Sequence, residues 1–233
     1  VTVLWIVGVT NAFNLLDNMD GLSAGVAAIA ALFVFVMAAD NGQFLVATLS
    51  VALVGCAGGF LRRNFHPAQI YMGDAGALFL GFTISVLVLK LDFVDQPRSL
   101  ALAVPVVLLG VPLFDTALVT VNRLLHGRSP LSGGRDHVSH RLVFIGVPVP
   151  VAVGLIYMVA GSLGCMALVL SRVDRGSGLI LMGWLAVVAA GLGALLSVVP
   201  VYETSQRRHL RLQEVARSVE EPLPPRPLAA DGD

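Results

Sequence analysis

Long runs of apolar residues without charge limit most strongly what this chain can fold into. Seven such runs follow one another, at approximately 1–16, 22–39, 44–61, 75–91, 99–122, 145–171 and 178–201. Most are close to the length of about 20 residues that a helix needs to cross a hydrocarbon core of roughly 30 Å. They lack the alternation of polar and apolar residues that is typical of membrane strands. The sequence therefore predicts an all-α, polytopic transmembrane helix bundle with about seven helices.

The composition agrees with a membrane protein. Hydrophobic residues make up 56% of the chain and charged residues only 13%, whereas soluble domains contain about one quarter charged residues. Both cysteines, Cys56 and Cys165, fall inside apolar runs and are interpreted as packing residues. The formal net charge is zero, and we expect no nucleic-acid partner. We expect a transmembrane catalytic domain at 1–202 and a cytoplasmic, disordered tail at 203–233.

The basic residues are divided unevenly between the two ends of the predicted bundle. Seven crossings place the loops near 17–21, 62–74 and 123–141 at the same end as the tail. That end holds Arg62, Arg63, Arg123, Arg128, Arg135, Arg141, Arg207, Arg208, Arg211, Arg217 and Arg226. The opposite end holds Lys90, Arg98, Arg172 and Arg175. The positive-inside rule then predicts that the arginine-rich end is cytoplasmic. We expect a multi-pass protein of the cell (plasma) membrane with its active site on the cytoplasmic face.

A first polar cluster, NAFNLLDNMDGL at 11–22, interrupts the apolar sequence. Four of its residues recur at every third position: Asn11, Asn14, Asp17 and Asp20. On a helix this spacing spreads the side chains over about half of the circumference. Asp20 precedes a glycine, so the helix is predicted to end near Asp17. Two carboxylates near a membrane surface can bind a divalent cation, hold a proton, or act as base or nucleophile.

A second cluster, RRNFHPAQIYMGDAGALFLGF at 62–82, combines a proline with several glycines. Pro67 suits a loop that turns back toward the membrane. Asp74 stands where the next apolar run begins, so it could cap that helix through the N-terminal amides. It could equally complete a Mg²⁺ site opposite Asp17 and Asp20, because Mg²⁺ takes oxygen ligands and keeps waters. Both interpretations stay open at this point.

A third cluster occupies FDTALVTVNRLLHGRSPLSGGRDHVSHRLV at 114–143. It places Asp115 at membrane depth and follows it with a basic, glycine-containing loop and two histidines, His137 and His140. Arginines together with glycines and histidines suit anionic phosphates, through guanidinium contacts and exposed backbone amides. A loop that only sets membrane orientation needs the arginines but not the paired histidines.

The three clusters together resemble the motifs of a known family. NAFNLLDNMDGLSAG, NFHPAQIYMGDAGALFLG and DTALVTVNRLLHGRSPLSGGRDHVSHRL are similar, in this order, to the signatures of the polyprenyl-phosphate N-acetylhexosamine-1-phosphate transferases. The resemblance implies transfer of a sugar-1-phosphate from a UDP-sugar to undecaprenyl or another polyprenyl phosphate, with release of UMP. The form RDHVSHRL favours the N-acetylglucosamine branch. The phospho-N-acetylmuramoyl-pentapeptide transferase branch remains the alternative.

The resemblance also implies roles for individual residues. Asp74 would be the Mg²⁺ ligand, with Mn²⁺ as the alternative ion. The catalytic residues would be Asp17, Asp20, His137 and His140. The substrate-binding residues would be Asn11, Asn14, Asn64, Arg123, Arg128 and Arg135. The implied partners are the UDP-sugar, the polyprenyl phosphate lipid and the membrane, and a homodimer stays open.

The sequence departs from the family pattern at four points. Asn18 stands where Gly is usual, Ala77 where Ser is usual, and Ser139 where many members have His. The family's Asp-Asp pair, which precedes the first motif, has no counterpart in this chain. We therefore expect that an amino-terminal portion of about four or five helices is missing, and that the chain alone is inactive. The alternatives from other classes are an inactive membrane fragment and an ion or proton transporter.

Overall fold

The structure, a computed structural model, describes residues 1–93, 97–130, 134–199 and 201. In these residues the regular structure is helical, as predicted. The helices are α1 (Thr2–Leu16), α2 (Leu22–Asp40), α3 (Phe44–Asn64), α4 (Gly73–Leu89), α5 (Arg98–Leu108), α6 (Gly110–Leu125), α7 (Val138–Phe144), α8 (Val149–Leu170) and α9 (Arg175–Ser197). The prediction of an all-α membrane bundle is confirmed. The predicted tail, 203–233, lies outside the described residues.

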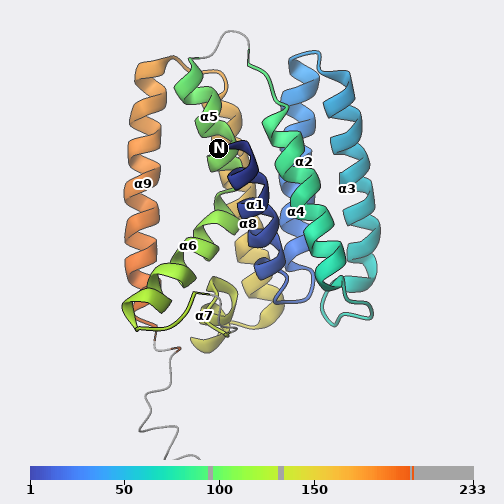
Figure 1. Cartoon of the computed structure of the whole chain (residues 1–233). Helices are drawn as coiled ribbons and strands as arrows, with labels where there is room; N and C mark the ends of the chain where they lie inside the picture. The colour runs from blue at the N-terminus through green and yellow to red at the C-terminus, as the bar shows by residue number, and fades with distance from the viewer. Residues whose placement is uncertain (94–96, 131–133, 200, 202–233) are drawn as a thin grey trace, which may run out of the picture. The chain divides into compact units, whose positions relative to one another are not determined.

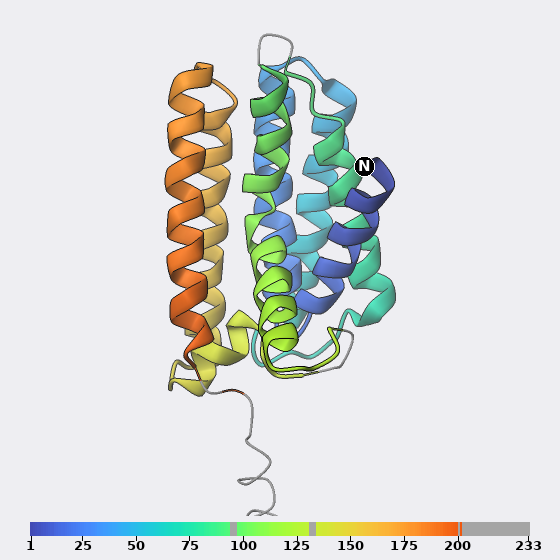
Figure 2. The same cartoon turned by 60° about the vertical axis from the view of Figure 1, so that its left-hand side comes forward.

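Several of these helices are long and apolar enough to cross a membrane. Helices α2, α3, α8 and α9 each pass this test, and α5 with α6 passes as a bent pair, whereas α1 and α4 are shorter apolar helices. The most apolar window of α2 is 61% buried and that of α9 only 6%. Helix α2 therefore lies inside the bundle, and α9 stands at its edge (Figure 1, Figure 2).

The fifth apolar run, 99–122, is not the single segment that the sequence predicts. It divides into α5 and α6, whose axes differ by 76°. Pro112 explains the break, because it has no N–H to donate to the carbonyl of Leu108 and its ring crowds that carbonyl. A further helix, α7, forms inside the third polar cluster, so the described chain contains more helices than the seven predicted.

The helices alternate in direction, so that the polar clusters meet at one end of the bundle. The α1–α2 turn, the α3–α4 loop and the segment from the end of α6 through α7 lie at the lower end in Figure 1. The α2–α3 and α8–α9 turns lie at the upper end. The three polar clusters thus lie at the same end of the bundle, as the predicted topology requires.

Small residues allow the helices that carry the polar end to pack closely. A Cβ added at Gly81 of α4 would lie 2.8 Å from the Cα of Thr10 in α1, so no larger residue fits there. Such close backbone approach is a usual basis of helix association in a membrane, where apolar burial against lipid contributes little.

The two cysteines do not take part in helix packing, because Cys56 and Cys165 are both exposed. Their interpretation as packing residues was wrong.

Candidate active site at the polar end of the bundle

The α1–α2 turn is held by hydrogen bonds from two other parts of the chain. The backbone of Gly21 adopts φ +77°, a conformation that favours glycine. Its N–H donates to Oδ1 of Asn64 (3.0 Å), and its carbonyl accepts from the hydroxyl of Tyr157 (2.5 Å). Nδ2 of Asn64 in turn donates to the carbonyl of Ile70 (2.9 Å). The buried Asn64 side chain therefore joins the first two polar clusters.

Asp20 makes a second connection between the same two clusters. Its Oδ2 accepts from the backbone N–H of Ala68 (3.1 Å) and lies 2.9 Å from Nδ1 of His66. The side chains of His66 and Asp20 are 41% and 25% exposed, so the pair faces the water-accessible end. Asp20 is thus oriented by the α3–α4 loop and keeps an accessible carboxylate.

The carboxylates of Asp17 and Asp74 repel each other. Partial burial raises the pKa of Asp17 above its ordinary value, and the negative charge of Asp74 raises this pKa further. Asp74 is exposed in the first turn of α4, and that helix has no side-chain cap at its N-terminus. The interpretation of Asp74 as a simple helix cap is therefore not supported.

These carboxylates fit a hard divalent cation only with help from other ligands. Within the described parts of the chain, no group of three or more His, Cys, Asp or Glu side chains could hold a metal ion. Magnesium usually binds to one or two carboxylates together with substrate phosphates and water. The repulsion between Asp17 and Asp74 is the kind that a cation relieves. The donor set therefore suits Mg²⁺ bound together with a phosphate.

The third cluster is built around a buried ion pair. Arg123 of α6 donates from Nε and Nη2 to both carboxylate oxygens of Asp136 (2.8 and 2.6 Å) and from Nη1 to the carbonyl of Pro130 (2.8 Å). Both charged side chains are almost completely buried. Arg141 is fully buried and donates to the carbonyls of Asp136 (2.8 Å) and Leu196 (2.6 Å). These bonds join α6, α7 and the end of α9.

Asp115 holds the beginning of α7. Its Oδ1 accepts from the backbone N–H of Val138 (2.7 Å), and its Oδ2 lies 2.7 Å from Nδ1 of His137. The side chains of His137 and Asp115 are only 5% and 4% exposed. A carboxylate bonded to one ring nitrogen of a histidine fixes the orientation of the ring. The structure therefore assigns Asp115 an orienting contact that the sequence did not predict.

His140 lies beside this pair in a different electrostatic setting. Its ring centroid is 6.4 Å from that of His137. Partial burial lowers the pKa of His140 below the ordinary value of 6.5, and the neighbouring His137 and Arg135 lower it further. His140 is therefore neutral at pH 7 and can accept a proton. Since the unfolded chain binds this proton more readily, the contribution of His140 to stability decreases as the pH falls below about 6.5.

The charge of Arg135 can be tested directly on His140. We expect the pH midpoint of His140 labelling by diethyl pyrocarbonate, which modifies neutral imidazole, to lie below 6.5. Arg135→Gln should raise that midpoint, because it removes a neighbouring positive charge. Mass spectrometry of the labelled protein measures both midpoints. Arg62→Gln, an exposed change on the α3–α4 side, is the control, and a midpoint that Arg135→Gln leaves unchanged would contradict the assignment.

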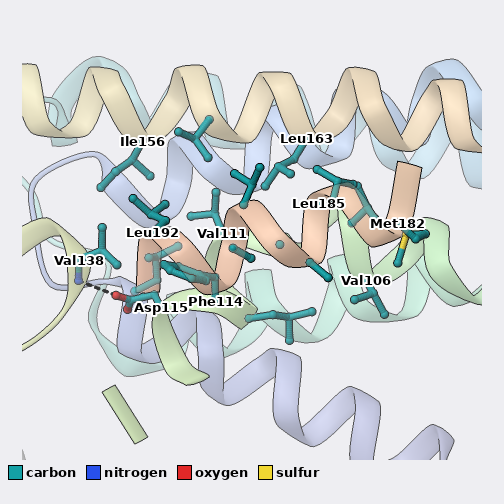
Figure 3. A pocket seen from close by; sticks show the side chains of 18 of the residues that line it. Val106, Val111, Phe114, Asp115, Val138, Ile156, Leu163, Met182, Leu185 and Leu192 are labelled. Carbon is teal, nitrogen blue, oxygen red and sulfur yellow. Dashed lines mark hydrogen bonds between the residues drawn. The ribbon is translucent and has the colours of Figure 1, made fainter. Parts of the chain in front are cut away.

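An apolar cavity opens next to the third cluster. It has a volume of about 500 Å³ and lies between α5, α6, α8 and α9. Figure 3 shows Asp115 and Val138 at one end, and apolar side chains such as Phe114, Leu163 and Leu185 along the remainder. The cavity therefore joins a polar end to a long apolar interior.

The predicted site residues divide into three groups. Asp17, Asp20, Asp74 and His140 are accessible or half-buried at the polar end, and so are Asn14, Arg128 and Arg135. Asn11 is exposed on α1. In contrast, Asn64, Arg123 and His137 are buried and bonded to other parts of the protein.

Four side chains make contacts at this end that the sequence did not predict: Asp136, Arg141, Tyr157 and Asp115. Tyr157 stands inside an apolar run, and its hydroxyl bonds to the carbonyl of Gly21 in the α1–α2 turn. Asp136 and Arg141 have no local pattern that separates them from an ordinary basic loop. Asp115 was noticed as an acidic residue at depth, which was the one available signal.

Comparison with known proteins finds a matching family and several relatives of this chain. Residues 1–92, which contain the first two clusters, match the model of glycosyl transferase family 4. The chain is 41% identical over 170 residues to a probable undecaprenyl-phosphate N-acetylglucosaminyl 1-phosphate transferase of Bacillus subtilis, covering 73% of this chain and 47% of that relative.

Two further relatives extend the comparison. A decaprenyl-phosphate N-acetylglucosaminephosphotransferase of Mycolicibacterium smegmatis is 35% identical over 207 residues, which cover 81% of this chain and 51% of that protein. A phospho-N-acetylmuramoyl-pentapeptide-transferase of Anoxybacillus flavithermus is 51% identical, but over 82 residues, which cover 35% of this chain and 25% of that protein. The chain spans about half the length of the first two relatives. From its motifs, its helical membrane fold and these matches, the chain is a member of glycosyl transferase family 4.

Proposed function

We propose that the protein transfers N-acetylglucosamine-1-phosphate from UDP-N-acetylglucosamine to a polyprenyl phosphate at the cytoplasmic face of the membrane. The observation that carries the proposal is the convergence of three polar clusters at one end of an apolar bundle, beside an apolar cavity. A water-soluble nucleotide sugar and a membrane lipid can meet only at such an end.

The reaction exchanges one phosphoanhydride bond for another. An oxygen of the lipid phosphate attacks the phosphorus that carries the sugar, and the bond from that phosphorus to the UMP oxygen breaks. The products are UMP and a lipid-linked diphosphate sugar, so no water or oxidant is consumed. Positioning and neutralisation of charge account for most of the catalysis in phosphoryl transfer.

The residues at the polar end supply these requirements in complementary ways. The exposed Arg128 and Arg135 are placed to attract phosphate oxygens. Asp20 is held by the α3–α4 loop for contact with the nucleotide or the acceptor. His140 and the oriented His137 can hold or move a proton at the phosphate oxygens.

Asp74 and Asp17 would hold Mg²⁺, with Mn²⁺ as the alternative ion. The support for this assignment is their mutual repulsion and the exposure of Asp74. When bound, the cation supplies positive charge that offsets the negative charge of the diphosphate. Asn14 lies in the last turn of α1, just before Asp17, and is placed to bind the nucleotide or to orient Asp17.

The apolar cavity is proposed to receive the first part of the polyprenyl chain. Its polar end contains Asp115, at the level of the polar clusters, and its long axis follows the apolar helices (Figure 3). This arrangement would leave the lipid phosphate near α7 and the prenyl units between α6, α8 and α9.

Filling this cavity gives a test with a matched control. Leu192→Trp should raise the KM for the lipid phosphate about tenfold with little change in the KM for the nucleotide sugar, since Leu192 lines the cavity. Leu195→Trp, three residues further along α9, is the control, because Leu195 is 69% exposed and does not line the cavity. Equal effects of the two variants on both substrates would exclude the cavity as the lipid site.

The function itself is tested with a panel of nucleotide sugars. The protein, expressed as its gene encodes it, is purified in detergent and supplied with undecaprenyl phosphate, with and without Mg²⁺. Release of UMP from UDP-N-acetylglucosamine alone would support the proposal. Release only from UDP-N-acetylmuramoyl-pentapeptide would favour the other branch, which the short match to the Anoxybacillus protein represents.

A further inference from the structure

We propose that Ser139 is a positioning residue, whose hydrogen bond to Asn18 couples the histidines of α7 to the aspartates of the α1–α2 turn. Oγ of Ser139 donates to Oδ1 of Asn18 at 2.6 Å, although the two residues are 121 positions apart in the chain. The influence on transfer rests on the function proposed above.

The bond lies between the two halves of the candidate site. Ser139 stands in the first turn of α7, between His140 and His137, the residue that precedes the helix. Asn18 stands between Asp17 and Asp20. A shift of this contact would therefore move the pair of histidines relative to the pair of carboxylates.

Both partners are held in place by their own surroundings. Ser139 is only 2% exposed. Nδ2 of Asn18 donates to the carbonyl of Leu15 at the end of α1 (2.8 Å), which leaves Oδ1 aimed at Ser139. The side-chain amide of Asn18 is therefore bonded both to the end of α1 and to α7. A partly buried bond of this kind specifies a geometry, because breaking it leaves a polar group without water.

Short helices such as α7 depend on contacts of this type. Helix α7 has seven residues and cannot be stable alone. Its N-terminal end is fixed by Asp115, and its Arg141 is bonded to α9. The bond from Ser139 connects this helix to the α1–α2 turn. The two departures from the family pattern, at positions 18 and 139, are therefore partners in this chain.

Ser139→Ala and Ser139→Thr separate positioning from packing. Ser139→Ala should lower kcat about tenfold while the KM for the nucleotide sugar changes less than about twofold, because ground-state binding does not need the histidines. Ser139→Thr keeps the hydroxyl and should restore most of the turnover. Asn18→Ala should lower kcat similarly, and the double variant should be no worse than either single variant.

A labelling measurement reports the same contact without activity. In Ser139→Ala, diethyl pyrocarbonate should modify His140 at least about threefold faster, since α7 is less firmly held. Labelling of His66, on the other loop, should stay constant. Ser162→Ala is the matched control, because Ser162 is exposed on α8 and its hydroxyl bonds only to the carbonyl of Met158 in its own helix.

The outcomes separate this inference from the proposed function. Lower kcat with faster His140 labelling, both restored by Ser139→Thr, would support the coupling. Unchanged turnover of Ser139→Ala in an active protein would overturn it. If the unmodified protein transfers no sugar phosphate, the proposed function fails, and the labelling then decides: faster modification of His140 supports the coupling, and unchanged modification overturns it.

Discussion

Asp74→Asn is expected to lower transfer of the sugar phosphate by about 100-fold or more, with the protein still folded in the membrane. Asn keeps the size of the side chain but removes the charge that a divalent cation requires. Steady-state release of UMP at several Mg²⁺ concentrations measures the effect. Folding should be preserved, because Asp74 is exposed and its negative charge repels that of Asp17.

Two further measurements make the assignment of Asp74 specific. Mg²⁺ should raise the thermal unfolding midpoint of the unmodified protein but not that of Asp74→Asn, since only a protein that binds the ion gains stability from it. Asp92→Asn is the control, as Asp92 is an exposed carboxylate near the end of α4 far from the polar clusters. Normal turnover of Asp74→Asn would remove Asp74 from the cation site.

Arg123→Met is expected to destabilise the protein by about 3–5 kcal/mol, because it removes the guanidinium that donates to both carboxylate oxygens of the buried Asp136. Arg123→Met with Asp136→Leu should recover most of this loss, since an apolar pair of similar volume often replaces a buried ion pair without cost. Thermal unfolding in detergent, monitored by size-exclusion chromatography, compares the variants. Arg62→Met, at an exposed arginine, should change the free energy of unfolding by less than about 0.5 kcal/mol.

The same double variant decides between two roles of Arg123. The sequence predicts a substrate-binding arginine, whereas the structure shows the guanidinium bonded to Asp136 and to the carbonyl of Pro130. If Arg123 is structural, the double variant should regain turnover together with stability. A stable double variant that remains inactive would mean that Arg123 also contacts the substrate.

A residue of the candidate site could be predicted only where the sequence around it carries a local signal. The sequence predicts Asp17, Asp20 and Asp74 as site residues because placing a carboxylate beside a membrane-spanning segment costs free energy. Such residues are therefore rare there unless they serve a function. The bend between α5 and α6 was also readable in principle, since Pro112 stands inside the fifth run. The contact between Ser139 and Asn18 was not, because nothing local marks two ordinary polar residues that are 121 positions apart.

For the buried residues of the site, the sequence does not predict which groups their side chains contact. Asn64, Arg123 and His137 were predicted from their motifs, but a motif does not show whether a side chain faces a substrate or another loop. Arg123 meets Asp136 only because the chain after α6 turns back upon that helix. The motifs therefore predict where the site lies better than they predict the role of each residue.

By itself the sequence determined the helical membrane class and the shared end of the three polar clusters. Apolar runs of bilayer length must become helices in lipid, where every backbone N–H and C=O needs an internal partner, and successive crossings alternate in direction. Only the tertiary structure decided which polar groups bond to each other. Such partners depend on distances of about 3 Å between segments far apart in the chain, and small rotations of the helices are enough to change them.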